Sequence, residues 1–394
     1  MSSSSVAYSE GGDWQSVHVY YYAEQQNDAL LLDCIQPLFV QARPITTRLF
    51  FVRHWLRGPH LRLRFYCSPT QFAVALKPLI ESIVGSYLRQ HPSSAHLDEE
   101  QLKGLYATLA RQEKEAGPFF PLYPDNSIQY LPYDRRLHVL GSEALASLLE
   151  DFYVDTNDLA FAMLAHRRQG HSLLTLCFDL MITVAHRQGQ HIARGFISYR
   201  SHAEGFIIAS ADPARMRTLL EDRYQQQAKT LVARLRQLLA ALDREQDTFP
   251  FTLAWSRLMQ RYQERAAQLI AAGQIDLSAA GLETDNGGGP LVRGNLAASA
   301  FHSALERDQQ HKQALYSDPW FQSYRLVLNL LYLHFSRLGL RPIDRFLLCH
   351  LAANAVEEAF KISAVDMVSA FSEGALSGPP PWPGERGRQH HAGA

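Results

Sequence analysis

Residues 50–65 read FFVRHWLRGPHLRLRF. Two runs of residues that favour β-strands flank an Arg-Gly-Pro segment, which is typical of a turn, so this stretch predicts a β-hairpin. The second run alternates polar and apolar residues, as a strand with one buried face does. The polar side of this strand would carry three basic residues, His60, Arg62 and Arg64. The apolar side would pack on a core.

Three basic side chains along one strand face repel one another. Uncharged polar residues would make the same face hydrophilic without this repulsion. Bound carboxylates, another anion or buried acidic residues would offset the repulsion, because the fork of an arginine can hold both oxygens of a carboxylate. A solvated sheet face with scattered counter-charges explains the same pattern, and the spacing does not separate the two interpretations. Arg53 in the first run is a further candidate for substrate binding.

Composition limits the class of protein. With 394 residues, 46% of them hydrophobic, the chain can bury one large core or two medium ones. The formal net charge of -1 and the pI near 7.0 argue against a general binder of nucleic acid or of anionic membranes. The N-terminus lacks the features of a signal peptide, and no apolar run reaches membrane-spanning length. We therefore expect a cytoplasmic protein.

The order of predicted elements indicates the fold class. A strand from Trp14 to Tyr22, a helix after Asn27 and the hairpin precede long helical regions, beginning with a helix from about Pro69 to Gln90. Further helices are expected over residues 97–115, 143–152, 158–187, 214–246 and 251–272 and in the C-terminal part. This order predicts an α+β fold, in which a small antiparallel sheet with a hairpin packs against a predominantly helical body.

The chain ends differ in composition from the middle. Residues 1–13 are rich in serine and glycine, and residues 374–394 contain a Pro/Gly-rich stretch followed by arginines and histidines. Both segments are expected to be disordered. We expect residues 14–373 to form a single domain.

Two similar segments, at residues 165–171 and 185–191, each contain basic residues, a glycine and a second histidine. Basic residues followed by glycine are typical of helix C-termini, where the charge complements the helix dipole. A site with paired histidines as metal ligands is the alternative. No acidic residue or cysteine accompanies the histidines at a convincing spacing, and the four cysteines of the chain form no CxxC pair. We therefore expect no metal.

Two predicted helices near the C-terminus carry polar residues on an otherwise apolar background. Arg325, Asn329 and Tyr332 share one face of the first helix, and His350 lies four residues before Asn354 on the second. Histidine suits proton transfer because its unperturbed pKa is close to neutrality. A core histidine that is hydrogen-bonded to the asparagine explains the same spacing.

Together, the HLRLRF strand after an aromatic-Arg-aromatic segment and the His-x-x-x-Asn helix resemble the C-terminal domain of lantibiotic dehydratases. This family includes stand-alone proteins of thiopeptide-type bacteriocin clusters. The resemblance covers about residues 14–360, and it implies that Arg62, Arg64 and His350 are catalytic. The residues expected to bind substrate are His60, Arg53, Asn354, Arg325 and Arg136.

The resemblance also implies a reaction. In full-length relatives, an N-terminal domain uses glutamyl-tRNA to glutamylate Ser or Thr of a precursor peptide, and the C-terminal domain eliminates glutamate to leave dehydroalanine or dehydrobutyrine. This chain would be one half of a split dehydratase, with a separate tRNA-dependent glutamylation subunit. It would act on the precursor peptide without binding nucleic acid or a membrane itself. No cofactor is needed, and the oligomeric state is left open, a homodimer included.

Two departures from elimination domains keep other functions open. Arg136 and Val139 stand where a Glu and an Arg are expected, and Ala355 stands where an Arg often follows the asparagine. Asp134, Arg136 or His138 could take the place of the missing Glu and Arg. One alternative is a pyridine synthase, a related branch that joins two dehydroalanines in a formal 4+2 cyclisation. The other is a peptide-binding subunit without catalytic activity. Elimination remains the main expectation because the two arginines and the histidine are retained.

Overall fold

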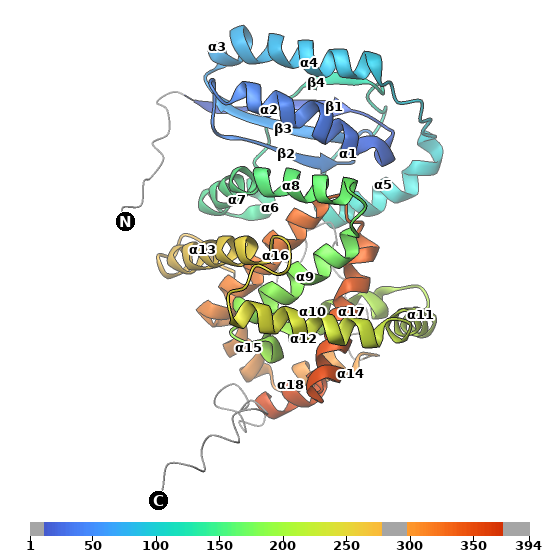
Figure 1. Cartoon of the computed structure of the whole chain (residues 1–394), viewed down its shortest axis with the longest axis vertical. Helices are drawn as coiled ribbons and strands as arrows, with labels where there is room; N and C mark the ends of the chain where they lie inside the picture. Colours follow the sequence, from blue (N-terminus) through green and yellow to red (C-terminus); the bar gives the residue numbers. More distant parts are fainter. Residues whose placement is uncertain (1–11, 278–297, 373–394) are drawn as a thin grey trace, which may run out of the picture.

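The computed structural model describes residues 12–277 and 298–372. The predicted disordered tail at 374–394 and nearly all of the predicted disordered segment at 1–13 lie outside these ranges, although Asp13 begins the first strand. The expected α+β class is confirmed: a four-stranded antiparallel sheet lies at one end of a mostly helical molecule (Figure 1). In the part of the chain that the structure describes, no helix is both long and apolar enough to cross a membrane.

The sheet has the strand order β2-β3-β1-β4. The strands are β1 (Asp13–Tyr20), β2 (Leu49–His54), β3 (His60–Cys67) and β4 (Ser127–Tyr130). The predicted hairpin is confirmed, since β2 and β3 pair in antiparallel register across a turn in which Gly58 has a φ of +113°. A Cβ at this position would lie 2.7 Å from the ring of Tyr22, so the turn requires glycine.

One face of the sheet is apolar and carries the core of the N-terminal half. Leu61, Leu63 and Phe65 are buried on this face, as the alternation in β3 predicts. Phe39 packs edge-on against Phe65, with ring centroids 5.7 Å apart.

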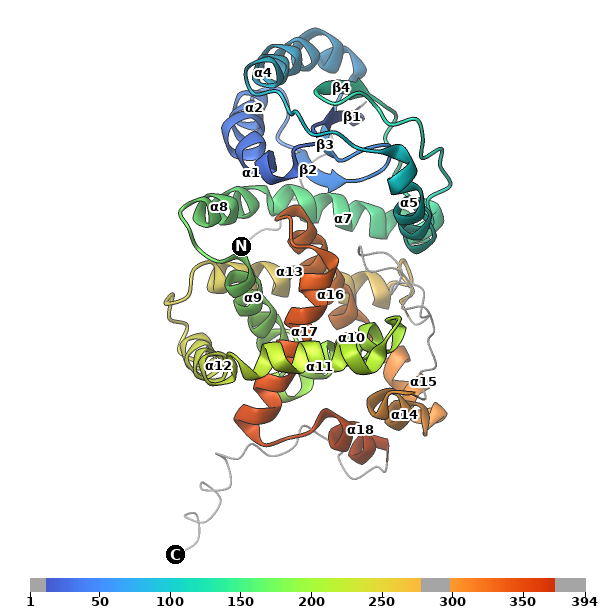
Figure 2. The same cartoon turned by 90° about the vertical axis from the view of Figure 1, so that its right-hand side faces the viewer.

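The helices of the N-terminal half surround the sheet. They are α1 (Asn27–Leu30), α2 (Gln36–Ala42), α3 (Pro69–Gln71), α4 (Lys77–Gln90), α5 (Glu99–Glu113), α6 (Leu137–Leu140), α7 (Glu143–Asp155) and α8 (Asn157–Arg168). Single π-helical turns, Leu31–Ile35 and Phe72–Leu76, connect α1 to α2 and α3 to α4, so each pair is one continuous helical segment. The helices α7 and α8 lie between the sheet and the helical body (Figure 2).

The helical body comprises the remaining elements. They are α9 (Leu173–Arg187), α10 (Ile192–Ala209), α11 (Pro213–Gln225), α12 (Ala228–Asp243), α13 (Thr252–Ala271), α14 (Ala300–Glu306), α15 (Gln309–Ser317), α16 (Pro319–Arg337), α17 (Pro342–Phe360) and α18 (Ala364–Ser372). The end of α16 reaches the sheet, where buried Arg337 donates from Nε to the backbone oxygen of Phe51 at 2.9 Å. This bond ties the helical body to the edge strand β2.

Two long predicted helices are each divided in the structure. The region predicted as one helix over 214–246 forms α11 and α12, because both helices pack on α17 and the chain turns at residues 226–227. The region 158–187 forms α8 and α9, separated by Gly170 with a φ of +95° and by Ser172, which caps α9. The predicted helix ends at both basic segments are confirmed, since α8 ends at Arg168 and α9 ends at Arg187.

Candidate active site

The second face of the sheet is basic. The register pairs β1 with β3 so that His18 lies opposite Arg62, while Arg64 and His60 flank this pair along β3. The rings of His18 and His60 stack with their centroids 4.9 Å apart. We call these four residues the basic sheet face. The alternation in β3 therefore places three of the predicted site residues side by side.

Arg64 is a buried cation with neutral partners. Its side chain donates from Nη1 to the hydroxyl of Ser16 and to the backbone oxygen of Leu63, and the guanidinium lies 4.9 Å from the ring centroid of Tyr133. Among the described residues, no carboxylate lies within ion-pair distance of Arg64. Burial and the charge of Arg62 lower the pKa of Arg64 to about 9, which still leaves the group charged at neutral pH.

Arg62 is held by a neutral histidine. Its Nε donates to His60 Nε2 at 3.2 Å, and His60 Nδ1 donates to the backbone oxygen of Gly58 at 2.8 Å. One ring nitrogen of His60 therefore donates and the other accepts, which fixes the tautomer. Burial, together with the charge of Arg62, lowers the pKa of His60 well below its ordinary value. The positive charge of this face thus comes from its arginines.

Acidic residues at the end of α5 and just after it offset part of this charge. Glu113 and Glu115 raise the pKa of Arg62 against the opposing effect of burial. Arg136 reaches the same two residues: its Nε lies 3.6 Å from Glu115 Oε1, and its guanidinium donates to the backbone oxygen of Glu113. Burial raises the pKa of the Glu113 carboxyl. The predicted substrate residue Arg136 therefore lies beside the basic sheet face, as part of a mixed cluster of arginines and glutamates.

His54, Glu113 and Glu115 place potential metal ligands within 4.8 Å of one another. His54 Nδ1 accepts the backbone N–H of Leu56 at 3.0 Å, so in the neutral ring the hydrogen is on Nε2, the atom that faces the two carboxylates. A nitrogen that carries hydrogen does not ligate a metal. Arg136 also supplies positive charge to these carboxylates. The donor set therefore does not fit a metal ion.

His350 and Asn354 lie in the helical body. His350 Nε2 is 3.0 Å from Asn354 Nδ2 and 3.3 Å from Glu221 Oε2, and Arg200 donates to Asn354 Oδ1 and to Glu357. Burial and the charge of Arg200 lower the pKa of His350 to about 4. Within the described ranges, the interaction partners of His350 are residues of α10, α11 and α17, and none is on the sheet. The structure thus does not bring His350 together with the two strand arginines.

Two other predicted substrate residues also lie elsewhere. Arg53 points to the opposite face of the sheet, where it donates to Asp28 Oδ1 at 2.8 Å and to the backbone oxygen of Arg337 at 2.9 Å. Arg325 donates to the backbone oxygen of Leu277 at 2.9 Å in the helical body. Both side chains hold segments of the fold together in this arrangement.

A buried polar cluster on α10, α16 and α17 was not predicted as a site. The hydroxyl of Tyr332 lies 2.8 Å from His202 Nδ1 and 3.5 Å from Cys349 Sγ, and the guanidinium of Arg345 lies 4.8 Å from the Tyr332 ring centroid. Burial and two arginines lower the pKa of His202 to about 3. The polar stripe on α16 pointed to Tyr332, but its partner lies 130 residues away in the sequence.

Comparison with known proteins agrees with the resemblance in the sequence. Residues 14–356, most of the chain, match the family described as lantibiotic biosynthesis dehydratase C-term. The chain belongs to this family. It is thus a protein of the biosynthesis of ribosomally made, post-translationally modified peptides, of the kind found in bacteriocin and thiopeptide pathways. The family includes enzymes that eliminate glutamate and enzymes that form pyridine rings.

Two solved structures show the same fold over nearly their whole length. "Pyridine synthase, TbtD, from thiomuracin biosynthesis" is 31% identical, with a TM-score of 0.72, and the match covers 89% of this chain and 99% of that chain. The second, "Crystal structure of TsrL", is 21% identical with a TM-score of 0.68, and the match covers 91% of this chain and 99% of that chain. No curated protein sequence matches the chain.

Proposed function

We propose that this protein is a pyridine-synthase-like cyclase, which joins two dehydroalanines of a precursor peptide in a formal 4+2 cyclisation. The observation that carries this proposal is the 31% identity to the pyridine synthase TbtD over 89% of this chain and 99% of that one. The resemblance noted in the sequence implies glutamate elimination as the main reaction, and the 31% identity to a pyridine synthase favours the cyclase instead.

The basic sheet face offers the groups that this reaction needs. For one dehydroalanine to act as a four-atom partner, the adjoining amide must move its proton from nitrogen toward oxygen, so that a C=N bond forms. Arg62 and Arg64 are buried N–H donors that can stabilise the amide oxygen as it gains negative charge. The hydrogen-bond partners of Arg64 are neutral, whereas Glu113 and Glu115 offset part of the positive charge of Arg62.

A proton acceptor is also required. The charge of Glu113 acts on Arg62, and burial raises the pKa of the Glu113 carboxyl, which makes it a stronger base than an exposed glutamate. We assign the amide proton to this carboxylate, which returns it to the amide oxygen before that oxygen leaves as water. After the two new bonds have formed, loss of water and of the leader peptide as a carboxamide completes an aromatic pyridine ring.

Glutamate elimination is the second candidate, and the same residues favour it. Arginine forks suit a glutamyl carboxylate, and Glu113 could remove the α-proton of the modified serine. Arg136 weakens this candidate because it stands where elimination domains are expected to carry a glutamate. Its side chain contacts the backbone of Glu113 and the carboxylate of Glu115, and it cannot act as a base.

Intact mass spectrometry separates these functions. The protein is incubated with two forms of a precursor peptide, one already dehydrated at two serines and one glutamylated on serine. Release of the leader from the dehydrated form, with the mass and ultraviolet absorption of a pyridine macrocycle, supports the cyclase. Loss of glutamate from the second form, with the first unchanged, refutes it in favour of elimination. Unchanged peptides that nevertheless bind the protein would identify a peptide-binding subunit.

A further inference from the structure

Arg64, the buried cation of the basic sheet face, is held along one edge of its guanidinium. Nη1 uses both of its hydrogens, one on the hydroxyl of Ser16 and one on the backbone oxygen of Leu63 at 3.3 Å. The opposite edge consists of Nε and Nη2 and carries three N–H groups. This edge makes no hydrogen bond with any described residue, so it is the edge that can meet a substrate oxygen.

The hydroxyl of Ser16 is itself oriented by His18. Ser16 Oγ lies 3.0 Å from His18 Nε2, and burial together with the nearby arginines lowers the pKa of His18, so its ring is neutral. Because Ser16 Oγ accepts a hydrogen from Arg64, its own hydrogen is available for His18 Nε2. These residues lie on the paired strands β1 and β3, so the sheet fixes the Nη1 edge of the guanidinium.

Tyr133 contacts the guanidinium from outside the sheet. It lies in residues 131–136, which follow β4 without regular secondary structure. Its ring centroid is 4.9 Å from Arg64 Cζ, within the range of a cation–π contact. Trp14 on β1 packs edge-on against the same ring, with the centroids 6.1 Å apart. This contact restrains the guanidinium without supplying a carboxylate that would neutralise it.

A buried ion pair fixes Tyr133 in turn. The hydroxyl of Tyr133 donates to Glu150 Oε1 at 3.1 Å, and Arg135 donates to both oxygens of Glu150, from Nε at 2.7 Å and from Nη2 at 3.0 Å. Glu150 is 4% exposed and lies on α7, the helix between the sheet and the helical body (Figure 2). Burial and the charge of Glu150 raise the pKa of the Tyr133 hydroxyl, which therefore remains a neutral donor.

We propose that Tyr133 is a positioning residue for Arg64, anchored to α7 through Glu150 and Arg135. The ring of Tyr133 and the hydroxyl of Ser16 together set the direction of the Nε–Nη2 edge. This inference rests on the proposed function, in which Arg64 stabilises the amide oxygen of the substrate. It also gives a role to the segment in which the sequence departs from elimination domains.

A double-mutant cycle tests this role. Both kcat and KM are measured for the wild type, Tyr133→Leu, Arg64→Met and the double variant, with the peptide form that the mass-spectrometric assay shows to be turned over. We expect Tyr133→Leu to lower kcat by about tenfold to 100-fold and to change KM by less than about twofold, because Arg64 acts in the transition state and loses its orientation. In the Arg64→Met background, Tyr133→Leu should lower kcat by less than about twofold further, since the group that it positions is absent.

Two tyrosine variants refine the test. Tyr133→Phe keeps the ring and loses the bond to Glu150, so its kcat should lie between those of the wild type and Tyr133→Leu. Tyr130→Leu is the matched control, because the hydroxyl of Tyr130 also donates to a glutamate, Glu81 at 3.3 Å, and a cation, Lys77, also lies 4.7 Å from its ring centroid. This cation is not part of the basic sheet face, and Tyr130→Leu should leave kcat unchanged.

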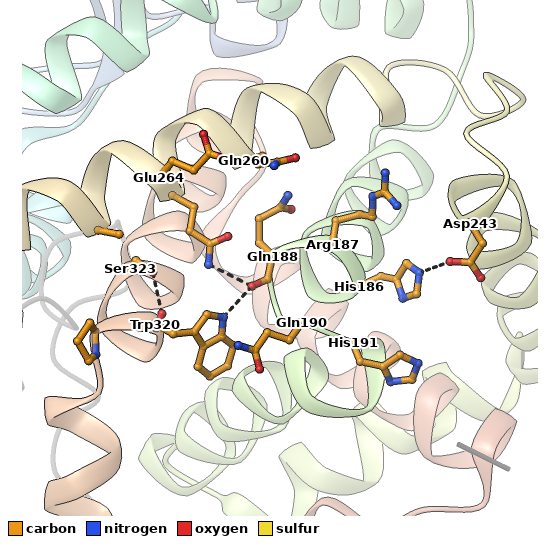
Figure 3. A pocket seen from close by; sticks show the side chains of 13 residues that line it. His186, Arg187, Gln188, Gln190, His191, Asp243, Gln260, Glu264, Trp320 and Ser323 are labelled. Atoms are coloured by element: carbon orange, nitrogen blue, oxygen red, sulfur yellow. Dashed lines mark hydrogen bonds and ion pairs between the residues drawn. The ribbon is translucent and has the colours of Figure 1, made fainter. Parts of the chain in front are cut away.

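A control in the helical body uses its cavity of about 770 Å³ (Figure 3). Glu264 lines this cavity, and the lining contains none of the residues that contact Arg64. Glu264→Gln removes a carboxylate charge from the protein without altering the surroundings of Arg64. It should therefore leave kcat unchanged in both backgrounds.

A spectrum of the protein without substrate separates failure of this inference from failure of the proposed function. In protein with isotope-labelled arginine, the Nε–H signal that disappears in Arg64→Met belongs to Arg64. The ring current of Tyr133 should shift this signal in the wild type and in Tyr133→Phe, and the shift should be lost in Tyr133→Leu.

Equal losses of kcat from Tyr133→Leu in both backgrounds would overturn the inference, and so would an Arg64 signal that is the same in the wild type and in Tyr133→Leu. Normal turnover by Arg64→Met would instead refute the role of Arg64 in the proposed function. A signal that is shifted in the wild type and not in Tyr133→Leu would even then support the contact through which Tyr133 positions the guanidinium.

Discussion

Buried charged side chains have different partners on the basic sheet face and in the helical body. In the helical body, Arg234 holds buried Asp179 with two hydrogen bonds, one from Nε to Oδ1 at 2.6 Å, and Arg217 holds buried Glu204 with bonds of 2.7 and 2.8 Å. On the sheet, Arg64 is equally buried, yet its partners are a hydroxyl, a backbone oxygen and an aromatic ring.

The difference separates charges that serve the fold from charges that are available to a ligand. Burial alone would raise the pKa of Glu204, but the hydrogen bonds and charge of Arg217, together with Arg200 and Ser299, outweigh burial, and the net pKa is lowered. Among the described residues, no carboxylate lies within ion-pair distance of Arg64, and burial outweighs the charge of Asp134, so the pKa of Arg64 is lowered. A cation that the protein leaves without a counter-ion gains most from a substrate group that carries or develops negative charge.

Replacing the unpaired cation should have the largest effect on activity. We expect Arg64→Met to reduce product formation by about 100-fold or more, the scale of losing one preorganised donor to an oxyanion. The free energy of unfolding should stay the same or rise, because a buried charge without a counter-ion is removed. Mass spectrometry of the peptide and urea denaturation measure the two effects. Normal turnover, with Arg43→Met as the exposed control, would contradict the role of Arg64.

Removing the arginine of a buried ion pair in the helical body should lower stability and leave turnover nearly unchanged. Arg234→Met leaves the Asp179 carboxylate, which is 3% exposed, buried and without its partner. We expect a loss of about 2–3 kcal/mol in the free energy of unfolding and little change in turnover at 25 °C. Arg168→Met, which removes an exposed pair with Asp33, should cost less than about 0.5 kcal/mol. A fall in turnover that exceeds the loss of folded protein would show that the matched pairs also serve catalysis.

The next prediction concerns Glu113, an acidic residue beside the basic sheet face. Glu113→Gln keeps the shape of the side chain but removes the proposed proton acceptor, so turnover should fall by about tenfold to 100-fold. The exposed variant Glu100→Gln is the control. If Glu113→Gln leaves turnover unchanged over the whole pH range, the proton acceptor is a different group.

The smallest expected effect is on the pH dependence of the free energy of unfolding. It concerns His350, whose pKa is lowered to about 4. An unfolded chain binds this proton at a pKa near 6.5, so the unfolded state holds more protons between pH 6.5 and 4, and stability is lost as the pH falls through this range. Its partner Glu221 has a 44% exposed side chain, so solvent screens the interaction. We expect the wild type to lose about 1 kcal/mol more than His350→Gln between pH 7 and pH 4.5. Urea denaturation at several pH values measures this, and parallel curves for the two proteins would contradict it.

The sequence by itself determined the local elements. Alternation in β3 predicted which side chains face the core and which form the basic face, because successive strand residues point to opposite sides. The turn at Gly58 followed from the conformational preference of a single residue. The family resemblance could likewise be read from short motifs in their order along the chain.

The tertiary structure alone decided which distant residues meet. The short strand β4 forms because Ser127–Tyr130 finds the free edge of β1, which no local pattern indicates. No feature of α17 indicates that His350 contacts Glu221, and the strand pattern around Arg53 does not show that its side chain binds Asp28. The energy of a polar contact depends on burial and on the groups that folding brings together. Local sequence spacing therefore does not predict contacts between residues more than 100 positions apart.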